Sequence, residues 1–293
     1  MKRGVKQRAR KHHFLPQALQ RPFCGECGQL WYSERNNDGL FSVPELRNTS
    51  STFKLRDFYT ILENGKLSDI VERQFYGTLD NFLAQFLNEV HDTLDKGMTP
   101  VVSGDALSSL RRVVYHLITR TPDFIKNQYD DVAIGREIAE ATLSEAIKHG
   151  ISDTDISDLR AILGDASGLR NMGRSVRVKA QSSPSKRVEE TLEDFVVRFA
   201  IINGKHSFVL ASQTAYRIGN GGHNGLSNPE MEIWLPISPK RALVLVRDKN
   251  GKIPLIVDEP RDHVRQVNEF AIRNAEQVAS HSQTLLHSLL NLS

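Results

Sequence analysis

Two adjacent histidines near the N-terminus are the first residues whose type and position could do chemistry. His12 and His13 come directly before Phe14-Leu15-Pro16. An imidazole titrates near neutral pH, so it can act as a general base or bind a metal ion. Adjacent side chains of an extended chain point to opposite sides, so one of the two at most faces a given pocket. The alternative is structural, with both rings exposed beside a basic tail or bonded to the backbone.

A CxxC pair, Cys24 and Cys27, is typical of metal knuckles and redox sites. Zinc takes four ligands, and the chain has only 2 cysteines. His12 or His13 could complete the set only if the chain folded back. We therefore predict no metal site and no cofactor, with a divalent cation and the role of the pair left open. Two cysteines are also typical of a reducing compartment, and we expect a cytoplasmic protein.

The glycine-rich run at 219–225 does not have the spacing of a phosphate-binding loop. Such a loop needs a helix directly after its glycines, whereas strand-like sequence follows this run. We predict a flexible loop between strands. The sequence also contains no GxSxG, HExxH or DxDxDG pattern.

The first half of the chain is predicted to form a hairpin followed by helices. Apolar runs at 30–32 and 40–43 flank the turn-like Asn36-Asn37-Asp38-Gly39, which indicates a β-hairpin. From Leu67 to Leu94 apolar residues recur at steps of three and four, which predicts one long amphipathic helix ending before Gly97. Further helical patterns cover 105–120, 122–149 and 153–163.

The second half combines a helical pattern at 188–202, several strand-like runs and a long amphipathic pattern at 264–289. We predict an α+β fold in which N- and C-terminal strands share one mostly antiparallel sheet, with an inserted helical bundle and a C-terminal amphipathic helix. The strands expected in that sheet lie at 30–43, 208–210, 233–235 and 243–246.

The predicted domain organisation is a basic arm at 1–11 and a single domain at 12–293. That domain contains a helical insertion at 65–163 and a basic loop at 165–187. Serine, glycine and proline residues occur along the basic loop at 165–187. Its part from 170 to 187 holds basic side chains but no acidic ones. A loop of this length is unusual in a compact domain, so it indicates either mobility or a phosphate-facing patch.

The composition, 39% hydrophobic and 25% charged, is that of an ordinary globular protein with a net charge of +3. No apolar run approaches the roughly 18 residues of a membrane span, and a secretory signal is not expected. The oligomeric state stays open. Basic residues of the N-terminal arm could make weak contacts with nucleic acid by displacing its counterions, unless the arm is simply solvated. These residues are Lys2, Arg3, Lys6, Arg8, Arg10 and Lys11.

Several segments together resemble a large, mostly bacterial family of domains of unknown function. That family opens with His-His-x-x-Pro and continues with Phe-Tyr-Thr, Arg-Thr-Pro, a Pro-Leu-Ser-Pro strand and a helix carrying an asparagine. The resemblance covers residues from about 11 to 280. The matching residues here are His12, His13, Pro16, Phe58-Tyr59-Thr60, Arg120-Thr121-Pro122, Pro236-Ile237-Ser238-Pro239 and Asn268.

One motif departs from the family pattern. Members commonly have Thr-Ser-Asp-Asn-Pro where this chain reads Ala211-Ser212-Gln213-Thr214-Ala215, so the serine remains and the carboxylate is lost. The resemblance brings no settled activity. It implies candidate catalytic residues (His13, Ser212 and Arg120) and candidate binding residues (His12, Tyr59, Gln213 and Asn268).

Two functions stay open from these residues. We expect a binding or interaction protein that keeps the family fold without catalysis, since the motif carboxylate is missing. The alternative is a hydrolase acting on a phosphate-bearing or nucleic-acid substrate. In either case we predict that His13 and Ser212 lie close together, with Arg120 or Tyr59 as a third member of the site.

Overall fold

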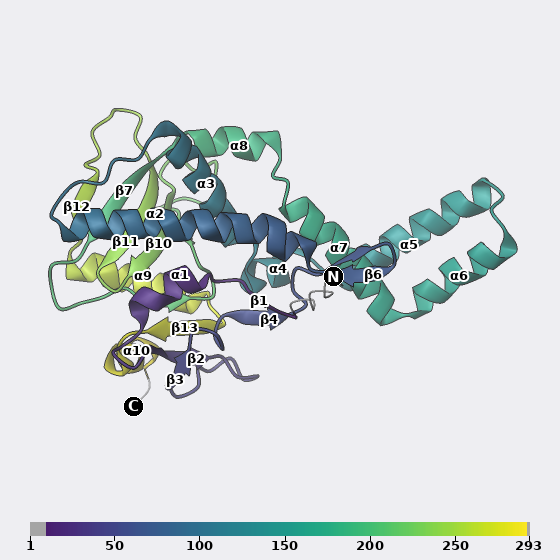
Figure 1. Ribbon diagram of the computed structural model, residues 1–293, viewed down its shortest axis with the longest axis horizontal. Coiled ribbons are helices and arrows are strands. Elements are labelled where there is room, and N and C mark those ends of the chain that lie inside the picture. The colour runs from purple at the N-terminus through teal and green to yellow at the C-terminus, as the bar shows by residue number, and fades with distance from the viewer. Residues whose placement is uncertain (1–9, 292–293) are drawn as a thin grey trace, which may run out of the picture. The chain divides into compact units, whose positions relative to one another are not determined.

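The computed structural model describes residues 10–291 (Figure 1). The chain combines helices with mostly antiparallel sheets, which confirms the predicted α+β class. It divides into two compact units. Unit 1 comprises the described residues up to His12, Leu55–Thr78 and Ile125–Pro184. Unit 2 comprises His13–Lys54, Leu79–Phe124 and the described residues from Ser185 onward.

Most of the predicted basic arm lies outside the described residues, so its contact with nucleic acid stays a prediction. The arm's last residue, Lys11, belongs to a short strand, β1 (Lys11–His13), which pairs with β4 (Lys54–Arg56). Within residues 10–291, no helix is long and apolar enough to cross a membrane.

Unit 1 is built around three helices that lie side by side: α5 (Asp131–Lys148), α6 (Asp153–Gly164) and α7 (Ala166–Gln181) (Figure 1). A β-hairpin of β5 (Ile61–Glu63) and β6 (Lys66–Ser68) also belongs to this unit. The helix predicted from Leu67 therefore begins later, as one π-helical turn, η2 (Val71–Tyr76), that continues into α2 (Gly77–Asp95).

The predicted basic loop at 165–187 is wrong, because most of it forms α7 and the start of α8 (Lys186–Glu193). Gly135 and Gly173 allow α5 and α7 to approach closely. A Cβ atom on Gly173 would lie 1.8 Å from the carbonyl oxygen of Asp131. The buried Arg177 donates to both carboxylate oxygens of Asp131, at 2.7 and 3.0 Å. One of the basic residues that suggested a solvated loop is therefore part of a helix–helix contact.

Unit 2 contains a five-stranded sheet in the order β12-β7-β11-β10-β9. All its pairings are antiparallel except β12 with β7, and β10 lies opposite β11 with Trp234 paired to Val244. Both faces of β10 and β11 are buried along almost their whole length. The strands are β7 (Phe195–Ile201), β9 (Tyr216–Ile218), β10 (Glu232–Ser238), β11 (Arg241–Arg247) and β12 (Ile256–Asp258).

A second sheet of unit 2 has four strands in the order β3-β2-β13-β8, here β3 (Glu45–Asn48), β2 (Gln29–Glu34), β13 (Gln277–Ser280) and β8 (Leu210–Ala211). N- and C-terminal strands therefore do share a sheet. The expectation that 233–235 and 243–246 would join it is wrong, since those residues form the five-stranded sheet. The sequence pattern of a strand shows that its residues join a sheet, but it does not show which strand they pair with.

Three element boundaries also differ from the prediction. The N-terminal hairpin has its turn at Gly39, where φ is +76°, and Arg35 pairs with Phe41 as expected, but the strand that pairs along most of β2 is β3, which lies beyond 40–43. The helix predicted at 188–202 ends with α8, because the following aromatic and β-branched residues form β7. The C-terminal helix is divided by β13 into α9 (Arg261–Arg273) and α10 (Gln283–Leu290).

The helices at the middle of the chain agree closely with the prediction. α3 (Gly104–Thr119) and α6 cover the expected ranges, and α2 ends just before Gly97, whose φ of +68° suits only glycine well. The segment expected from 122 to 149 is divided into α4 (Pro122–Gln128) and α5. The glycine-rich run at 219–225 connects β9 to β10, as a loop between strands.

Candidate ligand-binding site

His12 and Tyr59 meet within unit 1. The Nδ1 atom of His12 accepts a hydrogen bond from the Tyr59 backbone N–H at 2.9 Å. The two rings stack with centroids 5.7 Å apart and an angle of 5° between their planes. Both side chains are fully buried. His12 thus holds the segment that carries the Phe-Tyr-Thr motif.

His13 belongs to unit 2 and bonds to a different segment. Its Nε2 atom lies 3.2 Å from the carbonyl oxygen of Thr49, to which a ring N–H donates. Burial lowers the pKa of His13, and the positive charges of Lys54 and Arg120 act in the same direction. The neutral imidazole is therefore favoured here, in a setting where its N–H positions the backbone.

Arg120 is buried at the end of α3, with 1% of its surface exposed. Its Nη2 donates to Asp80 Oδ1 at 2.7 Å, and its Nε donates to the carbonyl oxygen of Phe14 at 3.1 Å. The residue after His13 in the chain is thus joined to the Arg-Thr-Pro motif. The structure brings His13 and Arg120 into the same neighbourhood of unit 2.

Ser212 lies at the end of β8 and is fully buried. Its Oγ accepts hydrogen bonds from the backbone N–H groups of Glu276 and Gln277 at 2.9 and 3.2 Å. Its hydroxyl faces the buried carboxyl of Asp123, at the start of α4. Burial raises the pKa of that carboxyl to about 6, although the Ser212 hydroxyl favours its charged form.

His13 and Ser212 bond to different partners within residues 10–291, so their predicted convergence on one ligand stays a prediction. The side chain of Asn268, on α9, also forms hydrogen bonds with backbone groups. Its Oδ1 accepts from the Val209 N–H at 3.1 Å and its Nδ2 donates to the Ser207 carbonyl at 2.9 Å. Gln213 follows Ser212 and is half-buried.

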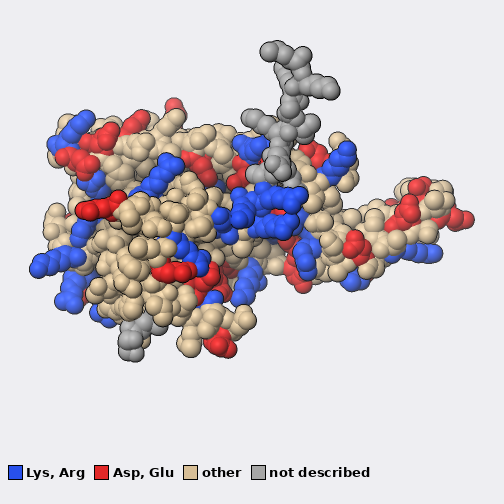
Figure 2. Space-filling model, turned by 60° about the horizontal axis from the view of Figure 1, so that its bottom comes forward, with Lys and Arg blue, Asp and Glu red and all other residues tan. Residues whose placement is uncertain are grey.

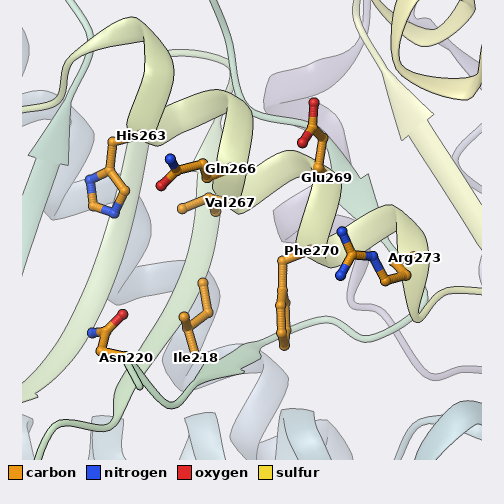
Figure 3. Close-up of a pocket in the computed structure, with 8 residues that line it drawn as sticks. All are labelled: Ile218, Asn220, His263, Gln266, Val267, Glu269, Phe270 and Arg273. Atoms are coloured by element: carbon orange, nitrogen blue, oxygen red, sulfur yellow. The ribbon is translucent and has the colours of Figure 1, made fainter. Parts of the chain in front are cut away.

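A pocket of 240 Å³ lies between α9, β9 and the first residues of the glycine-rich loop, all within unit 2. Its apolar part is formed by Ile218, Val267 and Phe270. Figure 3 shows the ring of His263 pointing toward Asn220, and the guanidinium of Arg273 reaching back toward Phe270. The complete lining is Ile218, Asn220, His263, Gln266, Val267, Glu269, Phe270 and Arg273.

His263 forms the strongest polar contact at this pocket. Its Nδ1–H donates to Glu259 Oε2 at 2.6 Å. Glu259 is 4% exposed and follows β12, whereas His263 lies in the first turn of α9. This hydrogen bond raises the pKa of His263 above its ordinary value, against the opposing effect of burial. The contact with Glu259 therefore favours the protonated form of the His263 ring more than water would.

A second layer of charges supports Glu259. Arg198 Nη2 lies 3.6 Å from Glu259 Oε1 and 3.2 Å from Glu232 Oε1. Glu232 in turn accepts a hydrogen bond from Trp234 Nε1 at 2.9 Å. The Trp234 indole meets the His263 ring nearly edge-on, with centroids 5.1 Å apart. The imidazole is thus held from two sides.

Two basic groups and one acid line the pocket. The Glu269 carboxylate points away from Ile218 in Figure 3 and pairs with Arg265 Nε at 2.7 Å. Its negative charge is therefore offset by a neighbour on the same helix. Arg273 leaves the pocket with a basic group that can meet an anion.

The sequence analysis did not identify His263, Glu259 or Arg273. The available signal was the spacing of Glu259 and His263, four residues apart where a strand-like run ends and a helical pattern begins. Residues four apart meet on one face of a helix. Spacing of this kind is common, and only the position of β9 opposite α9 shows that a pocket lies there.

No group of three or more metal-ligating side chains occurs among residues 10–291. Cys24 and Cys27 are free thiols, half-buried and exposed respectively. The pair stands at the end of a short helical segment, η1 (Arg21–Phe23), where the Cys24 thiol lies 3.8 Å from the Gln20 carbonyl oxygen.

The family model described as "Protein of unknown function (DUF4238)" matches residues 11–284. The chain belongs to the DUF4238 family. The match begins in β1 and ends in α10, so DUF4238 covers both units and every motif discussed above. No curated protein and no solved structure matches the chain.

Proposed function

We propose that this chain is a binding protein that takes a small carboxylate with an apolar body into the α9 pocket. The observation that carries the proposal is the 2.6 Å contact of His263 with the buried Glu259, at the edge of a pocket that Arg273 also lines. The guanidinium of Arg273 beside an apolar wall of Ile218, Val267 and Phe270 forms a complementary surface for such a molecule.

The family-motif residues support binding rather than catalysis at their own positions. His12, Arg120, Ser212 and Asn268 each bond to backbone groups of another segment. Arg120, Ser212 and Asn268 belong to unit 2, which contains the pocket, and these bonds support the fold of that unit. The loss of the motif carboxylate at Gln213 agrees with this view.

A hydrolase acting on nucleic acid or another phosphate-bearing substrate is the second candidate. Basic and acidic side chains are scattered over the largely uncharged face in Figure 2, where one group of basic side chains stands out near the middle. Nucleic-acid binding would need such a group to engage phosphates, and its affinity would fall steeply with salt. The α9 pocket, with a volume of 240 Å³, favours a small ligand instead.

The test compares hexanoate with hexan-1-ol, which has the same chain length without the charge, by isothermal titration calorimetry. We expect hexanoate to bind and the alcohol to bind at least tenfold more weakly, because a charge-assisted hydrogen bond contributes about 1.5–3 kcal/mol. Inorganic phosphate serves as the probe for the second candidate. Binding of phosphate in place of hexanoate would contradict the proposal.

Two variants assign the binding to this pocket. Arg273→Gln should weaken hexanoate binding about tenfold while leaving the melting temperature nearly unchanged, since Arg273 is exposed. Arg261→Gln is the matched control, because Arg261 is exposed on the same helix but does not line the pocket. Equal loss of affinity in both variants would mean that only the general charge of the helix attracts the anion.

A further inference from the structure

We propose that His263 is the general base of an ester hydrolase centre, whose substrate is an ester of a short apolar carboxylic acid and whose product is the bound carboxylate. The inference rests on the proposed function, because it assigns the carboxylate in the α9 pocket to the product side of a reaction. It goes beyond binding by giving the imidazole a chemical role.

The hydrogen bonding of His263 leaves one ring nitrogen for chemistry. Nδ1 is occupied by Glu259 at 2.6 Å, so in the neutral ring the proton is on Nδ1 and the lone pair is on Nε2. The side chain is 36% exposed and lines the pocket, and its ring points toward Asn220 (Figure 3). A carboxylate that fixes the tautomer while the opposite nitrogen faces a ligand is the arrangement that general-base histidines require.

The surroundings of Glu259 hold this arrangement in place. Glu259 is almost fully buried, and it is backed by Arg198, which also pairs with Glu232. The buried Trp234 restricts the other side of the imidazole. Positioning of this kind reduces the reorganisation needed when the ring becomes charged. Glu259 is therefore a positioning residue, and His263 is the residue that would meet water and substrate.

The reaction balances without a cofactor. Nε2 of His263 takes a proton from water, while the water oxygen forms a bond to the ester carbonyl carbon and the carbonyl electron pair moves to its oxygen. When the tetrahedral intermediate collapses, the bond from carbon to the alkoxy oxygen breaks. The alkoxide takes the proton from Nε2, so ester and water become carboxylic acid and alcohol.

The experiment measures hydrolysis of ethyl hexanoate by the full chain in a pH-stat. This alkyl ester is not activated, so incidental surface nucleophiles contribute little. We expect saturable hydrolysis that hexanoate inhibits as the product. His263→Gln should lower kcat/KM at least 100-fold, in line with the contribution of general acid–base catalysis. His149→Ala is the control, because His149 is an exposed histidine of unit 1 and should not matter.

Glu259→Gln tests the positioning role through the pH profile. Activity should rise with pH as the imidazole loses its proton, with a midpoint above the ordinary histidine pKa of 6.5, because the hydrogen bond to Glu259 and the charges of Glu259 and Glu232 outweigh burial and Arg198. Removing the Glu259 charge should shift that midpoint to lower pH and reduce kcat about tenfold. Glu259→Asp, which keeps the charge, should restore part of the pH profile even if the Gln variant is less stable.

The failure of this inference is distinct from the failure of the proposed function. Hexanoate binding without hydrolysis of ethyl hexanoate above the buffer rate would overturn the catalytic role and leave binding intact. Hydrolysis that persists in folded His263→Gln protein would also overturn it. No hexanoate binding and no hydrolysis would reject both.

Discussion

Buried polar side chains in unit 2 bond mainly to backbone groups of distant segments. Arg120 joins the end of α3 to Phe14, Asn268 joins α9 to the segment before β8, and Ser212 joins β8 to the start of β13. An unsatisfied buried donor or acceptor costs about 1–3 kcal/mol, so each of these side chains specifies one arrangement of its segments. The role of these polar residues is therefore to fix the arrangement of segments in the fold rather than to take part in a reaction.

Asp123 is the residue from which pH dependence of stability is expected. Burial raises its pKa from 3.8 to about 6 in the folded chain. The folded state therefore binds the proton more tightly than the unfolded state does. The stabilisation is complete below about pH 4 and is lost as the pH rises through about 6, with a total on the order of 3 kcal/mol.

Asp123→Asn should remove this dependence, because the amide does not titrate and is close in size to the carboxyl group. Urea unfolding between pH 4 and pH 8 measures the effect. The wild-type chain should lose stability relative to the variant across that range. If the free energy of unfolding changed with pH equally in the two proteins, ionisation of the buried Asp123 would not destabilise the fold, which would contradict the prediction.

At the scale of elements, the contact between α5 and α7 depends on two glycines. Gly135 and Gly173 have no side chain, and a Cβ atom at Gly135 would lie 1.9 Å from the carbonyl oxygen of Leu169. Backbone atoms cannot move aside as a flexible side chain can. The close approach also allows Arg177 to reach Asp131.

Gly173→Ala should therefore destabilise unit 1 by about 2 kcal/mol or more, although alanine is the better helix former by about 1 kcal/mol. Thermal unfolding followed by circular dichroism measures the change. Gly164→Ala is the matched control, since Gly164 ends α6 and a Cβ atom there meets nothing within 4 Å. A gain in stability at both positions would contradict the close contact.

At the scale of the whole molecule, the ends of unit 2 are joined by the pairing of β2 with β13. Trp31 lies opposite Ser280 and Tyr32 opposite Ala279, across nearly 250 residues of intervening sequence. β13 is a central strand, since β8 pairs with its other side. The N-terminal segment is therefore stable only once the C-terminal segment is in place.

Ala279→Pro should unfold unit 2 or destabilise it by about 3 kcal/mol or more, because proline has no N–H and clashes within a central strand. Gln283→Pro is the control, as Gln283 is the first residue of α10, where proline is tolerated. Tryptophan fluorescence during urea unfolding reports on Trp31 and Trp234 together. Similar unfolding midpoints for the two variants would argue against the central position of β13.

The spacing of apolar residues predicted where most helices lie. It did not predict where a long helical pattern is interrupted by another element. The apolar spacing and Gly97 were sufficient for the end of α2, because caps and periodicity act within a few residues. The same reasoning extended one helix through Val278, where the chain forms a strand instead. Val278 is apolar in either structure, and only its pairing with Ser33 and Ala211 favours the strand.

The sequence by itself determined the α+β class, the family and most helix positions, since these follow from composition, periodicity and short motifs. Only the tertiary structure decided which residues form a site. His263, Glu259 and Arg273 lie near one another in the chain, but the pocket exists because β9 and Asn220 lie opposite them. The motif residues His12, Arg120 and Ser212 could be named from the sequence, yet their partners come from segments far away. Pairing between distant segments is set by packing and register across the whole fold, which no local pattern encodes.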